Sequence, residues 1–455
     1  MTNDPKNTVS RRQFASTSAL AALSAAIVPR RVLGADAPSN KLNIAAIGVG
    51  GMGAANLKAC EGENIVALCD VDAAYAAKTF ALYPKAKVYK DFRVMLEKEK
   101  GIDAVVIATP DHTHAVITMA ALQAGKHVFC QKPLTHTVKE ARAITEAARR
   151  YGVVTQMGNQ GHSYESMRVL KEWIDDGAIG DVTEVHAWTD RPVGGDPWSD
   201  FAQLARPKDT PPVPETLDWD LWLGPVPFRP YHPEYVPMKW RAWLEFGTGP
   251  LGDMGCHILD PAFWALELGP PKTVQATSTH FQPEVASETF PRASIVRYEF
   301  PARGARPPVK LTWYDGRLLP PIPEELEPGR ALPGSGALLI GSKGKILHGS
   351  HGADGVRLVP EARMKEYTRP PKTLRRITGT HEDDWIRACK EGSSGVPPSS
   401  PFEYGGALTE MVLLGVLAIR LKDHRLEWDS PGLRFTNNEQ ANELLHIRYR
   451  DGWTL

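Results

Sequence analysis

The sequence has little of what marks several specialised classes of protein. It has only five cysteines among 455 residues, and no two of them form a Cys-x-x-Cys pair, so a disulfide framework is not expected. Neither charge dominates, because 53 Lys and Arg residues balance 53 Asp and Glu residues. This balance predicts neither a nucleic-acid partner nor attachment to a membrane surface.

Long hydrophobic runs are also scarce. After the first 37 residues we find no stretch approaching the ~20 apolar residues that a membrane-spanning helix needs, so no membrane insertion of the mature chain is expected. Metal ligands are equally sparse, since the pairs His112/His114 and His348/His351 lack a matching cluster of further ligands. What is present is ordinary globular composition, 42% hydrophobic and 23% charged, in a chain long enough for two or three domains.

The first 37 residues have the pattern of an export signal. Arg11 and Arg12 stand as a pair ahead of Phe14, and a small-residue, weakly apolar stretch follows over 15–28. The stretch Ala35-Asp36-Ala37 then matches an A-x-A-like cleavage site. We predict a twin-arginine signal over 1–37, with export in folded form to a periplasmic or extracytoplasmic location. A basic tail or an uncleaved anchor is the alternative.

A glycine-rich loop begins the region after the signal. The apolar run 42–47 predicts a buried strand, and it leads directly into Gly48-Val49-Gly50-Gly51-Met52-Gly53 and then a helical pattern. This order is the dinucleotide-binding fingerprint. Gly48 would allow the tight turn, Gly50 the approach of a pyrophosphate, and Gly53 close packing of helix on strand. The predicted cofactor-binding residues here are Gly48, Gly50, Gly51, Met52 and Gly53.

An acidic residue at the expected distance supports this interpretation. The apolar strand 65–69 ends at Asp70, 20 positions after Gly50, where a carboxylate would bond the adenosine ribose. A 2′-phosphate would be repelled there, and no Lys or Arg occurs between Asp70 and Ala77, so NAD is predicted over NADP. Asp70 could also cap the following helix.

The pattern of alternating strands and helices continues downstream. Strands predicted at 104–108 and 127–130 end in Thr109-Pro110 and Gln131-Lys132, with helical stretches at 94–98 and 115–124 between strands. This alternation predicts an α/β fold with a parallel, doubly wound sheet. Because ligands bind at the carboxyl ends of such strands, Thr109, His114 and Lys132 should face one crevice.

Taken with Gly252-Asp253-Met254-Gly255-Cys256-His257 and Asp260, these motifs resemble the glucose–fructose oxidoreductase/inositol dehydrogenase (Gfo/Idh/MocA) family over roughly 41–420. The resemblance implies an NAD-binding Rossmann domain over 38–160. It also implies a substrate-binding and oligomerisation α/β domain over 161–455, with a large, mostly antiparallel open sheet. A homo-oligomer, dimer or tetramer, is implied as well. The catalytic residues implied are Lys132, Asp253 and His257, and the further cofactor-binding residues are Thr109, Pro110, His114, Gln131 and Lys132.

The sequence departs from that family at two positions. Gln131 stands where the family usually has Glu, and a neutral amide cannot support the charge of Lys132, which we therefore expect to lose its proton more readily. His162 stands where relatives often have Arg.

The second half predicts an amphipathic helix at 167–176 and strands at 182–188, 293–300, 309–314 and 337–347. The irregular stretch 190–250 is dense in proline and aromatics, and a loop of that length is usually functional. Most of its rings would tie the loop to the domain surface. The candidate substrate residues are His162, Trp240, Arg241 and Trp243.

Asp253 and His257 are four residues apart, so on a helix they share one face. His257 would act as general base toward a substrate hydroxyl, Lys132 would hold that hydroxyl, and Asp253 would orient the substrate or share in proton transfer. A helix cap for Asp253 and a buried core position for His257 are the structural alternatives.

Three functions fit these residues. The first is an NAD-dependent oxidoreductase acting on a sugar, polyol or glycoside. The second is a redox-neutral glycosidase or lyase, or a sugar–sugar oxidoreductase, that keeps its cofactor bound. The third is a sugar-binding protein without catalysis, against which the intact glycine loop, Lys132 and His257 argue.

Overall fold

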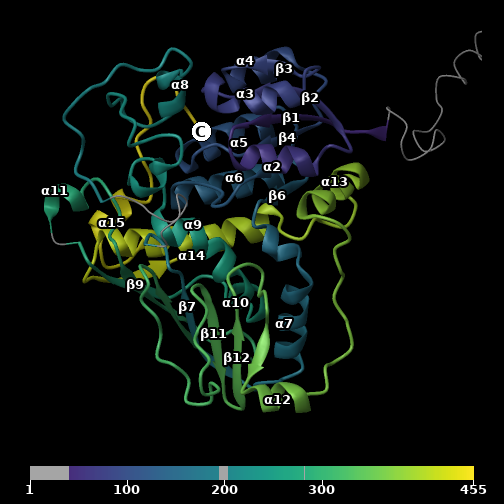
Figure 1. Ribbon diagram of the computed structural model, residues 1–455, viewed down its shortest axis with the longest axis vertical. Helices are drawn as coiled ribbons and strands as arrows, with labels where there is room; N and C mark the ends of the chain where they lie inside the picture. Colours follow the sequence, from purple (N-terminus) through teal and green to yellow (C-terminus); the bar gives the residue numbers. More distant parts are fainter. Residues whose placement is uncertain (1–39, 194–202, 281) are drawn as a thin grey trace, which may run out of the picture.

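The computed structural model describes residues 40–193, 203–280 and 282–455. The predicted twin-arginine signal lies outside these residues. The described chain forms two sheets with helices packed around them, and Figure 1 shows the parallel sheet above and the second sheet below. The predicted fold class, a doubly wound parallel sheet followed by an α/β part with a large open sheet, is confirmed.

The first sheet has six parallel strands in the order β3-β2-β1-β4-β5-β6. They are β1 (Asn43–Ile47), β2 (Asn64–Cys69), β3 (Lys87–Tyr89), β4 (Ala104–Ile107), β5 (His127–Cys130) and β6 (Thr155–Met157). The central strand β4 is buried along its whole length, which explains its uninterrupted run of Ala, Val and Ile. The short edge strands β3 and β6 were not predicted.

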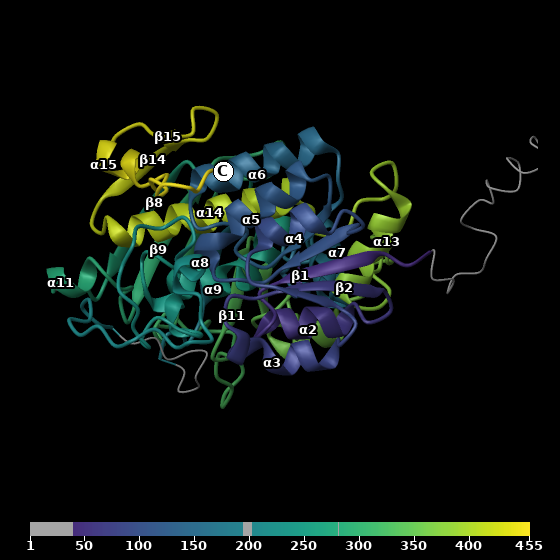
Figure 2. The same ribbon diagram turned by 90° about the horizontal axis from the view of Figure 1, so that it is seen from above.

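Helices cover both faces of this sheet. In Figure 2, α2 and α3 lie below β1 and β2, whereas α4, α5 and α6 lie above them. Their bounds are α2 (Met52–Ala59), α3 (Ala73–Leu82), α4 (Phe92–Lys98), α5 (Asp111–Gln123) and α6 (Val138–Tyr151). The start of α6 is set by a capping box, in which Thr137 and Glu140 bond each other's backbone N–H groups.

The second sheet has the strand order β13-β12-β11-β7-β10-β9-β8-β14-β15. Of its described pairs only β7 with β10 is parallel. The strands are β7 (Val182–Trp188), β8 (Thr273–Ser278), β9 (Ser294–Phe300), β10 (Val309–Tyr314), β11 (Gly336–Gly341), β12 (Gly344–His348), β13 (Arg357–Val359), β14 (Arg425–Asp429) and β15 (Arg434–Phe435). The single strand predicted at 337–347 is therefore wrong, because a turn at 342–343 divides it into an antiparallel hairpin.

The remaining helices are η3 (Gln160–Ser163), α7 (Glu165–Asp175), α8 (Trp219–Leu223), η4 (Lys239–Ala242), α9 (Gly249–Ile258), α10 (Asp260–Ala265), α11 (Pro283–Ala286), α12 (Glu361–Glu366), α13 (His381–Glu391), α14 (Phe402–Arg420) and α15 (Glu439–Glu443). The stretch 190–250, predicted to be irregular, thus contains α8 and η4 in its described part.

Helix α14 joins the two halves of the core. It packs against α6, α9 and β8, and nearly all of its side chains are buried. In length and composition α14 could cross a membrane, so the expectation that no later segment approaches that length is wrong. Its apolar character has a different physical reason here, since the helix is surrounded by other elements on most sides and needs no polar face.

Candidate active site

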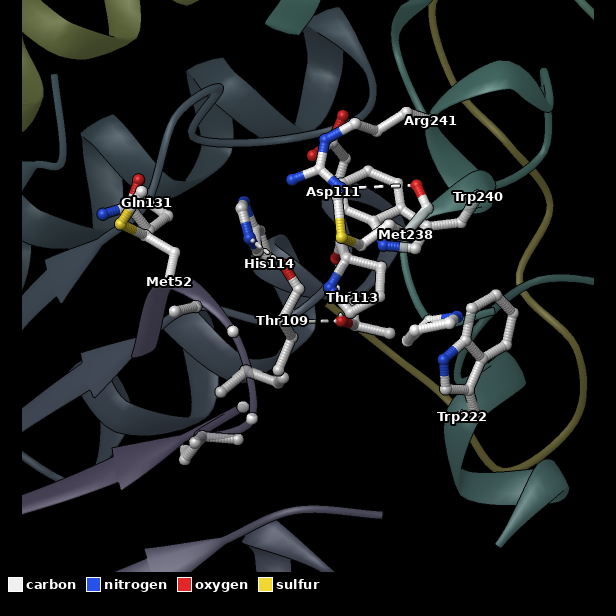
Figure 3. Close-up of a pocket in the computed structure, with 18 of the residues that line it drawn as sticks. Met52, Thr109, Asp111, Thr113, His114, Gln131, Trp222, Met238, Trp240 and Arg241 are labelled. Carbon is white, nitrogen blue, oxygen red and sulfur yellow. Dashed lines mark hydrogen bonds between the residues drawn. The ribbon is translucent and has the colours of Figure 1, made fainter. Parts of the chain in front are cut away.

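One cavity of about 330 Å³ lies where the two halves meet. The carboxyl edge of the parallel sheet forms one wall, and α8, η4 and α9 form the other. Figure 3 shows Met52, Thr109 and His114 on the sheet side facing Trp222 and Trp240 across the cavity. This is the crevice at which a parallel α/β sheet binds ligands.

The glycine loop has the geometry that the fingerprint predicts. Gly48 has a φ of +78°, a left-handed conformation that L side chains rarely adopt, and it forms the tight turn after β1. A Cβ on Gly53 would lie 1.9 Å from the Gly48 carbonyl oxygen, so α2 can pack on β1 only with glycine there. At Gly50 a Cβ would instead meet the ring of Tyr75, a side chain of α3.

The start of α2 fits a pyrophosphate. Its N-cap is Gly51, and no side chain caps the helix, so the first backbone N–H groups of α2 have no side-chain acceptor. These groups and the positive end of the helix dipole suit an anion. Met52, the first residue of α2, is exposed at 42% and lines the cavity.

Asp70 lines the same cavity and organises the loop around it. Its carboxylate accepts hydrogen bonds from the backbone N–H of Val49 at 2.8 Å and of Asp72 at 3.0 Å. Burial raises the pKa of Asp70, and the backbone bonds act against that rise. The helix cap considered for Asp70 is supplied by Asp72, whose side chain accepts from Ala74 N and Tyr75 N.

Thr109 and Pro110 follow β4 and line the cavity, with Pro110 as the N-cap of α5. His114 also lines it, but both of its ring nitrogens lie against backbone carbonyls, Nδ1 2.8 Å from Pro133 O and Nε2 2.8 Å from Thr109 O. Burial opposes protonation of this imidazole, yet Cys130 and the two carbonyls together raise its pKa. The structure thus gives His114 a positioning role, since it joins the loop after β4 to the Lys132-Pro133 loop.

Gln131 lies apart from the charge of Lys132. Its Nε2 donates to Asn56 Oδ1 at 3.1 Å, within α2. Lys132 instead contacts Asp253, with Nζ 2.6 Å from the Asp253 carbonyl oxygen and 3.0 Å from Oδ1. Lys132 therefore has a carboxylate partner that the sequence around Gln131 does not reveal, because α9 supplies it.

Asp253 is the centre of a charge cluster. Besides Lys132, its carboxylate bonds the guanidinium of Arg191 and lies 3.4 Å from Arg241 Nε. Burial opposes ionisation of Asp253, but the charges of Lys132, Arg191 and Arg241 outweigh it and hold its pKa well below the usual range. The carboxylate is ionised at all physiological pH values and holds three cations in place.

His257 lies one helical turn beyond Asp253 and is buried beside the cluster. Burial lowers its pKa well below the usual value, and the charge of Lys132 and the neighbouring His351 lower it further. The two imidazole rings lie 4.3 Å apart at 33°. Within the described residues the buried Nδ1 of His257 has no hydrogen-bond partner. A neutral imidazole has one unprotonated ring nitrogen, which can accept a proton.

Asp111 adds a buried carboxyl at the first turn of α5. Its Oδ2 accepts from Thr248 Oγ1 at 2.6 Å, and burial raises its pKa to about 7. The alternation pattern did not single out this residue. A carboxyl that titrates near neutral pH inside a ligand cavity is typical of functional sites.

The four candidate substrate residues separate into two pairs. Trp240 and Arg241 line the cavity, with the Arg241 guanidinium stacked 4.2 Å from the Trp240 ring centroid. His162 is not at the cavity wall: it is 1% exposed and its Nδ1 bonds Asp260 at 2.9 Å. Trp243 is also 1% exposed and packs on Tyr235 in an aromatic cluster. The substrate role given to His162 and Trp243 is wrong, because neither side chain reaches the cavity.

Sequence reasoning missed other residues that line the cavity. Arg191, His351 and Tyr75 come from separate segments, none within a recognised motif. Lys90 lies at the end of β3, beside β2 and Asp70, so the search for basic residues between positions 70 and 77 did not include it. Only the strand order brings these side chains together.

The curated relatives match only part of the chain. The inositol 2-dehydrogenase of Klebsiella pneumoniae subsp. pneumoniae is 35% identical over 145 residues, which is 30% of this chain and 43% of that protein. The levoglucosan dehydrogenase of Pseudarthrobacter phenanthrenivorans is 27% identical over 191 residues, 42% of this chain and 38% of that protein. The matched segments thus span less than half of each relative.

Solved structures share the fold over most of the chain. The WlbA dehydrogenase from Bordetella pertussis, solved with NADH and UDP-GlcNAcA, has a TM-score of 0.59 at 16% identity, covering 86% of this chain and 99% of that one. A levoglucosan dehydrogenase in complex with NADH has a TM-score of 0.54 at 20% identity, covering 85% and 99%.

Two family models match in tandem. The NAD-binding Rossmann fold of an oxidoreductase family matches 42–159, and the C-terminal alpha/beta domain of the same family matches 166–298. Together they include more than half of the 455 residues. With the glycine loop and Asp70 in place at its nucleotide site, the chain belongs to the Gfo/Idh/MocA family of NAD-binding oxidoreductases.

Proposed function

We propose that the protein oxidises a hydroxyl-bearing carbon of a sugar, polyol or glycoside, with Lys132, Asp253 and His257 as its catalytic residues. One observation carries the proposal: a neutral, buried histidine and a charge-paired lysine lie together in the cavity that also contains the glycine loop. Relatives named as inositol and levoglucosan dehydrogenases support the substrate class.

Oxidation of the substrate removes a hydride from its carbon and a proton from its hydroxyl, and different parts of the site would act on each. The glycine loop 48–53 and Asp70 would hold NAD⁺, which when bound would supply the acceptor for the hydride of the carbinol carbon. His257 would take the hydroxyl proton, which its low pKa allows it to do from the neutral state at physiological pH. Lys132 has three N–H donors and two contacts to Asp253, so one donor is available for the substrate oxygen.

The cation cluster would stabilise charge on that oxygen. As the proton leaves, negative charge develops on the substrate oxygen, and Lys132 supplies a fixed positive charge beside it. Asp253 keeps Lys132, Arg191 and Arg241 oriented toward the cavity. Trp240 lines the same wall and offers an aromatic face to the C–H face of a sugar ring.

A redox-neutral cycle is the second candidate, favoured by the paired Arg11 and Arg12 of the predicted export signal. Little free NAD is available outside the cytoplasm, so an exported enzyme benefits from returning the hydride to its own product. In that case the same three residues would take part in the initial oxidation, in the glycosidic cleavage or elimination that follows, and in the final reduction of the product.

The test first identifies the bound nucleotide and then measures whether NADH accumulates during turnover. The full chain is denatured and any released nucleotide is identified by mass spectrometry; the intact protein is then incubated with sugars, polyols and aryl glycosides. A net oxidoreductase accumulates NADH at 340 nm, whereas a redox-neutral enzyme forms product without NADH. His257→Asn should abolish turnover with either outcome, and His424→Asn, at an exposed residue outside the cavity lining, should not. Full turnover by His257→Asn would contradict the assignment.

We also propose export by the twin-arginine route and assembly into a homo-oligomer. Replacing Arg11 and Arg12 together by Lys should leave the protein in the cytoplasm, as measured by fractionation of expressing cells. Light scattering of the purified protein gives the number of subunits, and a monomer at micromolar concentration would contradict the second proposal.

A further inference from the structure

The cavity extends beyond Asp70 to a second wall that the catalytic proposal does not use. Phe92 at the start of α4, Leu221 and Trp222 of α8, and Trp453 line this part. Trp453 lies downstream of the segments that the two family models match. Of these four residues, Trp453 alone therefore lies outside the segments that the family models match.

The strand order shows which half of a dinucleotide would meet this wall. Along the carboxyl edge of the sheet the residues run Phe92 after β3, Asp70 after β2, the glycine loop after β1, and Lys132 after β5. With the pyrophosphate at the start of α2 and the reacting half beside Lys132, the adenosine half would lie on the opposite side, toward Asp70 and Phe92.

Trp453 is held at this end by aromatic and cationic neighbours. Its ring centroid lies 6.1 Å from that of Phe92, and the Arg93 guanidinium carbon lies 4.6 Å from it. The side chain is only partly buried and contributes to the cavity lining. A base entering the adenosine end would thus meet an indole ring already placed by its other contacts.

The segment 444–455, here called the strap, is hydrogen-bonded to α8 and to the two residues that follow it. Arg450 Nε donates to Gly224 O at 2.6 Å, Arg450 Nη2 donates to Asp220 O at 2.6 Å, and the Arg450 N–H donates to Pro225 O at 3.0 Å. Tyr449 Oη donates to Glu140 on α6 at 2.5 Å. Figure 1 shows the end of the strap, marked C, between α8 and the Rossmann helices.

The residues just before α8 are in turn hydrogen-bonded to the loop after Asp70. The backbone N–H of Asp218 donates to Val71 O at 2.8 Å, and that of Ala73 donates to Thr216 O at 2.9 Å. Within α8 the rings of Trp219 and Trp222 stack at 4.7 Å and 12°. The wall is therefore bonded to the Rossmann domain at both the Asp70 side and the α6 side.

We propose that Trp453, with Leu221 and Trp222, forms the adenine-binding wall of the cofactor site and retards release of NAD. The inference rests on the NAD-dependent function proposed above. Aromatic rings stack on nucleobases through their π faces, and the strap keeps the Trp453 ring in place before the base arrives. A retained cofactor is what a redox-neutral cycle requires.

The experiment measures binding of NAD⁺, AMP and nicotinamide mononucleotide to the nucleotide-free full chain by titration calorimetry. Trp453→Ala should raise the Kd for NAD⁺ and for AMP by about 5-fold or more, the effect of losing one base–aromatic stack. The Kd for nicotinamide mononucleotide, which lacks adenosine, should stay unchanged. Trp453→Phe should bind all three nearly as the wild type does.

The matched control is Phe228→Ala, another aromatic truncation, at a residue 69% exposed and outside the cavity lining. Unchanged AMP binding in Trp453→Ala would overturn the inference and leave the proposed function standing. An equal loss for AMP and nicotinamide mononucleotide would also overturn it, as general damage to the fold. A wild-type protein that binds neither NAD⁺ nor AMP would overturn both proposals.

Discussion

At the scale of single residues, the close pair of imidazole rings formed by His257 and His351 is the feature most open to test. The rings lie 4.3 Å apart, and only one of the two was assigned a role from the motif. Two imidazoles at this distance disfavour each other's protonation, because each would place a positive charge beside the other. His351 therefore helps to keep His257 neutral.

We predict that His351→Asn moves the acid limb of the kcat/KM profile to higher pH. Burial and Lys132 would still lower the pKa of His257, but the contribution of His351 would be lost, so the pKa of His257 would rise. Protonated His257 cannot accept a proton, and activity would fall at a less acidic pH than in the wild type. The exposed His424→Asn is the control, and an acid limb in the same place in both variants would refute the prediction.

At the scale of elements, the glycine loop shows how a close backbone contact restricts the residue type at one position to glycine. Gly53 lies on α2 with its α-carbon against the Gly48 carbonyl, and a Cβ there would be only 1.9 Å from that oxygen. Both the Gly53 α-carbon and the Gly48 carbonyl belong to the backbone, so neither can move aside as the end of a flexible side chain could. Relief of the clash requires α2 to shift away from β1, and the start of α2 is where the pyrophosphate would bind.

We predict that Gly53→Ala destabilises the fold by about 1–3 kcal/mol and weakens NAD binding by more than 10-fold. Gly62→Ala is the matched control, because nothing lies within 4 Å of a Cβ at Gly62 and its φ is not left-handed. Chemical denaturation measures the first effect and calorimetric titration the second. Equal stability of the two variants would show that α2 accommodates the extra methyl group.

The parallel sheet and its ligand edge could be predicted from sequence because their signals are local. The apolar runs before Gly48 and Asp70, and the helical patterns after them, lie within a few residues of each other. The hairpin β11–β12 was missed because its two-residue turn interrupts an apolar run that is otherwise continuous. Periodicity does not distinguish one long strand from two short ones there.

The site could be predicted only as far as its motifs extend. Asp253 and His257 share a helix face, as their spacing predicts, but the contact of Asp253 with Lys132 bridges 121 positions. Arg191 and His351 reach the cavity from the loops after β7 and β12, and no spacing rule connects them to α9. His162 failed as a substrate residue because burial, and not residue type, decides whether a side chain meets a ligand.

At the scale of the whole molecule, several histidines are buried in the neutral form. Burial lowers the pKa of His112 to about 3 and the pKa values of His136, His348 and His381 to about 4. In the unfolded chain each of these groups titrates near 6.5. Below that pH the unfolded state binds protons that the folded state does not.

We predict that stability falls as the pH is lowered from 6.5 toward 4, by about 1.4 kcal/mol per pH unit for each excess proton bound by the unfolded chain. Asp111 and Asp315 oppose this trend, because burial raises their pKa to about 7 and about 6 and the folded state holds their protons in this window. Burial also raises the pKa of Asp70, Glu140, Glu245 and Glu382. Within the described residues the histidines whose pKa is lowered still outnumber these carboxyls, because His127, His186, His257, His280, His351 and His446 join the four. Urea denaturation at pH 7 and pH 5 measures the difference, and greater stability at pH 5 would contradict the prediction.

The position of Trp453 also has a consequence for the order of events during synthesis. The glycine loop and Asp70 leave the ribosome before Asp253 and His257, and the strap with Trp453 leaves after all of them. A nascent chain folds as it emerges, so the Rossmann strands can assemble while the opposite wall of the cavity is still unmade. On the role proposed for Trp453, NAD is retained only after the strap has been made, hundreds of residues after the glycine loop that would bind its pyrophosphate.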